Sequence, residues 1–325
     1  MKVAEVIDRR TPEWRQLEDD VSKCRAGEYR RNPARLAAFA RRYRAVCGDL
    51  SLAESMRFPA ATLQYLHQLV ADSHTQLYRA ENFQIRKWGR TILVDIPRRI
   101  LRDPCTWIAF AVFWGLFGGS MLAAAMQDGF AASVVGEETL QEMETMYARP
   151  MESDAFEESR TVMTGFYLWN NAGIGLRCFA SGIFLGIGSL FTLAFNAIFL
   201  GAIFGHMTRT SSSSNFLTFV TAHGPFELTA VVLSGAAGLR LGWSLIDSQG
   251  WNRGDALQRA APNALEIAGV ATALFLLAAY IEGYVSPSEL PYAVKLATAV
   301  VSSMLLLGYV FGFGLFSRGR LHDGS

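Results

Sequence analysis

The sequence predicts an all-α protein, a polytopic membrane helical bundle with about six spans, an N-terminal cytoplasmic helical region and an external amphipathic helix. Three observations lead to this fold class. Beyond Pro104, several stretches of about 18 to 25 residues are mostly apolar, which is the length needed to cross a bilayer. Before Pro104 the chain has no such run and shows helical periodicity instead. Basic residues also gather before the first span and acidic ones after it.

Residues 1–81 are expected to form three or four short helices that pack as a small cytoplasmic bundle. In "RRTPEWRQLEDDV", Thr11 is the expected N-cap and Pro12 the first helical position, with Glu13 in the first turn. Trp14 begins an apolar stripe at i, i+3 and i+7. Two further stretches repeat this pattern, each with a proline near its start.

Residues 82–104 form a distinct basic segment directly before the first span. "NFQIRKWGRTILVDIPRRILRD" carries six Lys and Arg residues interleaved with large apolar ones. This pattern is typical of an amphipathic helix that lies on an anionic membrane surface. An ordinary surface helix is the alternative, and adjacency to the first span favours the interfacial one.

The first span is expected at residues 105–126, and an acidic segment follows it at 127–165. From Asp128 to Arg160 this segment carries nine acidic residues but only two arginines. The positive-inside rule therefore places the N-terminus in the cytoplasm and this segment outside. Helical periodicity in "EETLQEMETMYARPMESDAFEE" predicts an external amphipathic helix.

Residues 166–316 are expected to form the rest of the membrane bundle. The apolar stretch 166–207 is too long for one crossing, so we divide it near Gly186–Ser189 into two helices. Six crossings place both termini in the cytoplasm. The later spans are expected at about 215–246, with a break near Gly224–Pro225, at about 264–284 and at about 292–316, before a basic tail at 317–325.

Several polar residues lie within these apolar stretches, where a charge costs about 2.5–3.5 kcal/mol on insertion scales. Such residues normally face protein or a water-filled cavity. Glu227 and Glu282 are candidates to pair with Arg177 and neutralise it. The predicted intramembrane polar network comprises Asn170, Asn171, Arg177, Asn196, His223, Glu227 and Glu282.

His223 and Glu227 stand at i and i+4, so their side chains lie on one face of a helix. Such a pair can be half of a metal site, part of a proton or substrate path, or a structural hydrogen bond between helices. A zinc protease helix would supply two histidines as HExxH, but this pattern is HxxxE, and His206 could approach only through the fold. We expect the structural network, with no metal site and no cofactor.

Small residues are frequent in the predicted spans, and several glycines have GxxxG spacing, which lets helix backbones approach closely. The pattern predicts tight helix packing or a homodimer. The predicted packing glycines are Gly182, Gly186, Gly201, Gly205, Gly224, Gly238 and Gly242.

Sequence motifs for soluble-type catalysis are missing: there is no GxSxG, no Walker loop and no GxGxxG before a helix. The basic residues near the start lack the aromatic interleaving of a nucleic-acid groove, so no nucleic acid is expected as a partner. We therefore expect a protein that is not an enzyme. An intramembrane hydrolase would need a metal or nucleophile that the sequence does not present.

Three stretches resemble the stage II sporulation protein M (SpoIIM) family of bacterial integral membrane proteins. They are "NNAGIGLRCFASGIFLGIGSLFTLAFNAIFLG", "HGPFELTAVVLSGAAGLRLG" and "AAYIEGYVSPSELP". They follow the family pattern of an Asn-Asn pair, a Gly-rich stretch, His-Gly-x-x-Glu-Leu, and Ile-Glu-Gly before a proline. The family's Asn-Gly is Asn196-Ala197 here. The opening "RRTPEWRQLE" is also similar to the start of many members.

The resemblance implies a bacterial inner-membrane protein of the cell envelope. The sporulation member works in a membrane complex with peptidoglycan-degrading partners, and relatives are often encoded beside a MoxR-type AAA ATPase and an RDD-type membrane protein. No catalytic residues are implied. We expect a non-enzymatic scaffold in the lipid bilayer, and the glycines favour a homodimer. The alternative is a transporter or channel subunit that works with a separate ATPase.

Overall fold

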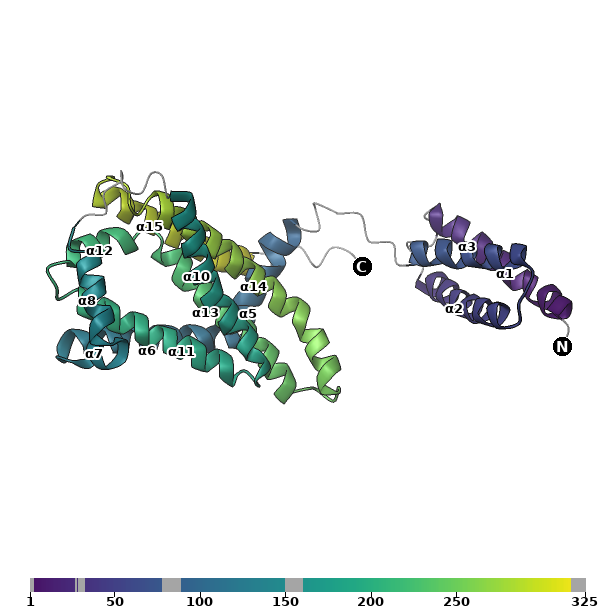
Figure 1. Ribbon diagram of the computed structural model, residues 1–325, viewed down its shortest axis with the longest axis horizontal. Coiled ribbons are helices and arrows are strands. Elements are labelled where there is room, and N and C mark those ends of the chain that lie inside the picture. Colours follow the sequence, from purple (N-terminus) through teal and green to yellow (C-terminus); the bar gives the residue numbers. More distant parts are fainter. Residues whose placement is uncertain (1–2, 27, 29–32, 78–88, 150–159, 317–325) are drawn as a thin grey trace. The chain divides into compact units, whose positions relative to one another are not determined.

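The computed structural model describes residues 3–26, 28, 33–77, 89–149 and 160–316, and within these ranges every regular element is helical (Figure 1). The all-α prediction is confirmed. The chain divides into two compact units, Met1–Ile85 and Arg86–Ser325. The division falls within the basic segment predicted at 82–104.

The N-terminal unit consists of α1 (Val3–Arg25), α2 (Pro33–Ser55) and α3 (Ala60–Leu77). Its core takes the predicted stripe of α1, and Leu17, Phe39 and Leu66 are fully excluded from solvent. Three helices with one shared apolar core confirm the small bundle that the periodicity predicted.

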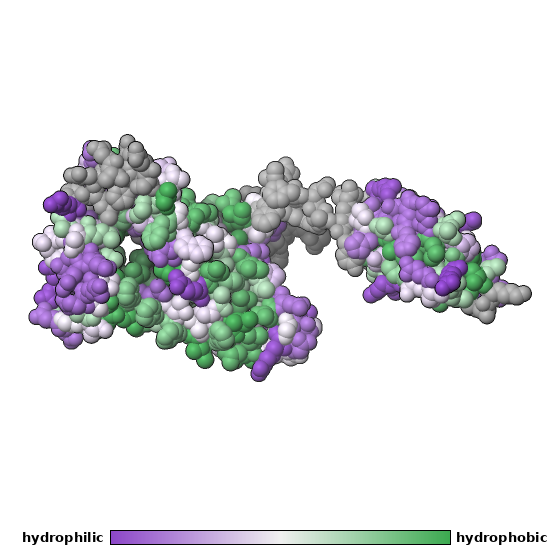
Figure 2. Space-filling model, in the orientation of Figure 1, coloured by the Kyte–Doolittle hydropathy of each residue, from purple (hydrophilic) through white to green (hydrophobic). Residues whose placement is uncertain are grey.

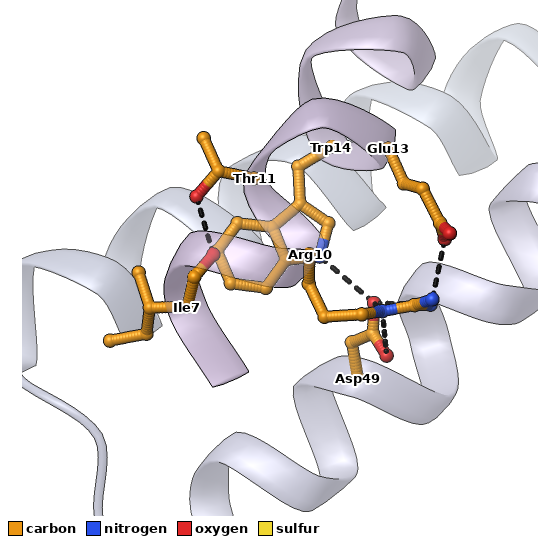
Figure 3. Close-up of polar contacts among 6 residues, drawn as sticks. All are labelled: Ile7, Arg10, Thr11, Glu13, Trp14 and Asp49. Carbon is orange, nitrogen blue, oxygen red and sulfur yellow. Dashed lines mark hydrogen bonds and ion pairs between the residues drawn. The ribbon is translucent and has the colours of Figure 1, made fainter. Parts of the chain in front are cut away.

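The predicted start of α1 is wrong, because the helix begins at Val3 and Pro12 lies inside it. Thr11 is not an N-cap: its hydroxyl donates to the carbonyl of Ile7 at 2.6 Å, one turn back in the same helix (Figure 3). A proline in a helix interior costs about 3 kcal/mol. Contacts of Arg10 and Trp14 with α2 hold the helix on both sides of the proline, and this tertiary packing overrides the local signal.

The described part of the basic segment packs on the membrane bundle. A π-helical turn at Thr91–Asp95 leads into α5 (Ile96–Arg102), and Ile96 and Ile100 are buried in the bundle core. Arg99 forms an ion pair with Glu266. Residues 82–88 of the predicted interfacial helix lie outside the described residues.

Five helical segments are long and apolar enough to cross a membrane among the described residues. They are α6 (Pro104–Met126), α11 (Ile187–Met207), α13 (Gly224–Ile246), α14 (Arg253–Tyr284), and α15 (Tyr292–Leu307) continued by a π-helical turn to Phe313. The stretch 166–207 divides where predicted, because α10 (Arg160–Ala180) and α11 are separate helices. α10 has 21 residues but is not among the five, and its arginine and asparagine residues make it less apolar.

The break predicted at Gly224–Pro225 is also present. α12 (Ser213–Val220) ends before a turn, and α13 begins at Gly224 with Pro225 in its first turn. The acidic segment contains α7 (Phe130–Val135) and α8 (Glu137–Met146), which confirms a helix in "EETLQEMETM"; residues 150–159 of this segment are not described.

α13 is the central helix of the membrane unit. It packs against α6, α10, α11 and α14, whereas α15 lies at the periphery (Figure 1). Apolar residues cover much of the visible surface of this unit, and hydrophilic ones gather over α7–α8 and the turn between α13 and α14 (Figure 2). Trp169, Phe184 and Phe191 are more than two-thirds exposed. An apolar surface of this extent fits contact with lipid.

Candidate functional site

Glycines allow α13 to approach the turn between α10 and α11. Side chains added at Gly182 or Gly238 would overlap the facing backbone, since Gly182 meets the Gly238 carbonyl and Gly238 meets the Cys178 carbonyl. Gly242 lies against Gly186 in the same way. Gly186 also has φ of +78°, a left-handed conformation that a glycine adopts without strain.

A second glycine contact joins α11 to α6. A Cβ at Gly201 would meet the carbonyl of Phe117, and one at Gly205 would meet the carbonyl of Met121. Gly224 differs from the other predicted packing glycines, because nothing among the described atoms lies within 4 Å of a Cβ placed there. The six packing glycines are thus used within one chain.

His223, Glu227 and Glu282 form a compact polar cluster at one end of α13 and α14. His223 directly precedes α13, Glu227 lies in its first turn, and Glu282 lies in the last turn of α14. One ligand atom from each residue lies within 4.8 Å of the others. Nε2 of His223 is 3.5 Å from Oε2 of Glu227. His223 and Glu282 are buried, with 4% and 8% of their surfaces exposed.

Neighbouring polar groups orient the cluster. The Ser286 hydroxyl is 2.9 Å from Nδ1 of His223, and Nδ2 of Asn171 donates to Oε2 of Glu282 at 3.2 Å. Asn170 donates to Oδ1 of Asn171 at 3.1 Å. Lys295, itself buried, donates to the carbonyl of Ser286 at 2.6 Å. Five of the seven residues predicted for the polar network are therefore brought together: Asn170, Asn171, His223, Glu227 and Glu282.

Arg177 and Asn196 lie elsewhere, and among the described contacts neither reaches the cluster. Arg177 is exposed, and its Nε donates to the carbonyl of Gly173 in its own helix at 3.1 Å. The expected pairing of Arg177 with Glu227 or Glu282 is therefore not made. Arg177 stands six residues after Asn171, which moves it about 9 Å along the helix and about 120° around it. Asn196 donates to the carbonyl of Thr192, one turn back.

The end of α8 and the segment after it cover one side of the bundle close to the cluster. Tyr147 follows α8 and is buried against Phe216 and Phe219, and the ring of Phe219 contacts that of His223. Burial, then Tyr167 and the carboxyls of Glu282 and Glu227, raise the pKa of Tyr147 well above its usual range. A cavity of about 310 Å³ adjoins the cluster, and its lining includes Tyr147, Phe219, Ser286 and Lys295.

His206 does not approach the pair His223 and Glu227, the contact that the sequence analysis considered for it. Its Nε2 lies 2.6 Å from Oε1 of Glu144 in α8, so it ties α11 to the acidic segment. The sequence analysis did not identify Ser286 or Lys295 as part of the polar network. Lys295 carried a signal, because a lysine four residues into an apolar span is costly unless it is paired. Ser286 carried none, because serine is common in turns.

The cluster offers one imidazole nitrogen and two carboxylates with few competing partners. Such a group can exchange protons, bind a cation, or hold α10, α13 and α14 together through hydrogen bonds. All three uses depend on the same close approach of α13 and α14.

Comparison with known proteins extends this description. A model of the family "Stage II sporulation protein M" matches residues 106–287, and a model titled "Domain of unknown function (DUF8413)" matches residues 4–79. The uncharacterized protein MJ0793 of Methanocaldococcus jannaschii is 25% identical over 130 residues, which cover 38% of this chain and 71% of that protein. No solved structure matches the chain. The first match spans more than half of the chain and contains α13, α14, almost all of α6 and the three residues of the polar cluster, so the protein belongs to the SpoIIM family.

Proposed function

We propose that this protein is a non-enzymatic membrane scaffold of a bacterial cell-envelope complex, in which parts outside the bilayer recruit partners. The observation that carries the proposal is the division into two compact units. The unit Met1–Ile85 has its own apolar core, so it can present a binding surface independently of the membrane helices. The membrane unit anchors that surface in the lipid.

The proposed orientation follows from charge. The basic residues before α6 and in the tail are placed in the cytoplasm of the inner membrane, and the acidic segment with α7 and α8 outside. In this orientation the N-terminal unit meets cytoplasmic partners and α7–α8 meets envelope components, in keeping with a role in envelope or peptidoglycan remodelling.

We further propose a MoxR-type AAA ATPase as the cytoplasmic partner and an RDD-type membrane protein as a partner in the bilayer, since relatives are often encoded beside both. A homodimer is a third proposed contact. Leu36 and Leu52 on α2 supply a test of the cytoplasmic contact, because each is 43% exposed, whereas the other large apolar residues described in this unit are buried or partly buried.

The experiment is cross-linking in intact membranes followed by purification of the full chain and mass spectrometry. Replacing Leu36 and Leu52 with glutamate is expected to reduce recovery of the ATPase at least tenfold while the membrane unit stays folded. The matched control replaces the exposed Gln64 and Gln68 of α3 with glutamate and keeps the partner. Absence of any reproducible partner in the unaltered protein, or equal loss in both variants, contradicts the scaffold.

A transporter or channel subunit is the second candidate, and the buried cluster of His223, Glu227 and Glu282 beside a cavity favours it. Ionisable residues inside the membrane commonly mark ion or proton paths. Flux in proteoliposomes tests this function. Proton or cation flux that Glu227→Gln abolishes supports it, and flux equal to that of protein-free vesicles rules it out for the chain alone.

A further inference from the structure

We propose that His223, Glu227 and Glu282 form a binding site for one divalent transition-metal ion of the Zn²⁺ class. The inference goes beyond the proposed scaffold, because partner recruitment requires no ion. It departs from the expectation of no metal site, which rested on the HxxxE pattern and the lack of a second histidine at ligand spacing. The third ligand is Glu282, which stands 55 residues after Glu227 and reaches the site through the packing of α14 on α13.

The spacing of the ligand atoms fits an ion. Two atoms bound to Zn²⁺ at about 2.1 Å and at a tetrahedral angle lie about 3.4 Å apart. Nε2 of His223 and Oε2 of Glu227 are 3.5 Å apart, which is longer than an ordinary N–H···O hydrogen bond. The ligand atoms of all three residues lie within 4.8 Å of one another. Side-chain rotations that shorten the longest of these separations by about 1.4 Å bring all three atoms to the spacing of one tetrahedral ion.

Polar groups behind two of the three ligands hydrogen-bond to them and fix their direction, as at known metal sites. Ser286 holds Nδ1 of His223 and leaves Nε2 directed at Glu227. Asn171 holds one oxygen of Glu282, and Asn170 in turn holds Asn171. These contacts come from α10 and from the turn after α14, so every ligand but Glu227 has a fixed outer partner.

Charge balance favours the same conclusion. When both carboxyls are ionised and the imidazole is neutral, the three groups carry a charge of −2. A divalent cation cancels that charge in a region where uncompensated charge is costly. Arg177, the arginine that could have supplied this compensation, is exposed and bonded to its own helix. Lys295 donates to a backbone carbonyl beside the cluster.

The donor set selects the class of ion. A site with an imidazole nitrogen and carboxylate oxygens suits Zn²⁺, Mn²⁺ or Fe²⁺, whereas Mg²⁺ and Ca²⁺ prefer oxygen ligands alone. Three protein ligands leave a fourth position for water. The cavity of about 310 Å³ lies next to the site rather than in it, because its lining includes Ser286 and Phe219, which contact His223, but none of the three ligands.

The test uses the full chain in lipid nanodiscs, stripped with a chelator and reloaded with Zn²⁺. Bound metal is counted by mass spectrometry, and affinity is measured by competition with a chromogenic chelator. We expect one Zn²⁺ per chain and a loss of affinity of at least 100-fold for Glu227→Gln and Glu282→Gln. The matched control is Glu144→Gln, which removes a carboxylate from the His206–Glu144 pair outside the cluster and should leave affinity unchanged.

Asn171→Ala provides a second variant that keeps all three ligands. Loss of an outer partner lowers metal affinity about 10- to 100-fold, so this variant should bind Zn²⁺ weakly while remaining folded. Fewer than 0.1 Zn²⁺ per unaltered chain overturns the proposal, as does equal affinity in Glu144→Gln and Glu282→Gln. The scaffold is judged separately, by partner recovery from the same preparations, so either proposal can fail alone.

Discussion

Replacing Asp49 with alanine should loosen the N-terminal unit, because Asp49 is the point where α2 holds α1 (Figure 3). Its carboxylate accepts hydrogen bonds from Nε of Arg10 at 2.9 Å and from Nε1 of Trp14 at 2.9 Å. Asp49 is 15% exposed and Arg10 27% exposed at the side chain, and Trp14 is buried. The substitution therefore leaves an indole N–H without its acceptor inside the bundle.

The magnitude follows from these contacts. A charge-assisted hydrogen bond is worth about 1.5–3 kcal/mol, and an unsatisfied buried donor costs about 1–3 kcal/mol. Arg10 keeps a second partner, Glu13, at 2.6 Å, which reduces the first contribution. We expect a loss of about 3 kcal/mol in the free energy of opening α1 from α2. This corresponds to about a 100-fold faster amide exchange in both helices.

Hydrogen exchange read by mass spectrometry on the full chain in nanodiscs measures this opening directly. Asp19→Ala is the control, because Asp19 and Lys23 form an exposed pair within α1 and its removal should leave exchange unchanged. Trp14→Phe combined with Asp49→Ala should cost less than the sum of the two changes. An increase below threefold for Asp49→Ala would show that this contact does not hold the unit together.

Three further outcomes are expected. Gly238→Val should lower the free energy of unfolding by about 1–3 kcal/mol or more, seen as a lower melting temperature, because the added side chain meets the backbone of Cys178. Gly224→Val is the control, because a side chain there enters open space and should leave the melting temperature unchanged. Equal melting temperatures for the two variants would refute the packing role of Gly238. Phe113→Ala removes a fully buried ring and should lower the free energy of unfolding by about 3–5 kcal/mol. A fall in melting temperature no larger than that of a substitution at a lipid-facing position would contradict this expectation. Burial and then Glu18 raise the pKa of Tyr65 to about 12 from 10, so its contribution to stability is complete below pH 10 and is lost as the pH rises through 12. Denaturation at a series of alkaline pH values should show a steeper fall for the unaltered chain than for a variant with phenylalanine at this position, and parallel curves would refute the assignment.

The apolar runs predicted the membrane helices because spanning a bilayer is a local requirement on about 20 consecutive residues. The same locality explains the predicted break before Gly224, the division of 166–207 and the stripe that begins at Trp14. Local signals failed where distant contacts were stronger. Thr11 and Pro12 have the pattern of a helix start, yet α1 continues past them. Asp49, in another helix, bonds to Arg10 and Trp14 on either side of these residues.

The sequence also placed His223 and Glu227 on one face, because i and i+4 are neighbours on any helix. It could not select their partner: charge predicted that Arg177 would pair with Glu227 or Glu282, and this pairing is not made. The packing of α14 on α13 brings Glu282 to the pair, and the position of Arg177 on α10 turns it away. Sequence thus determined which residues are polar inside an apolar bundle, and only the tertiary structure decided which of them meet.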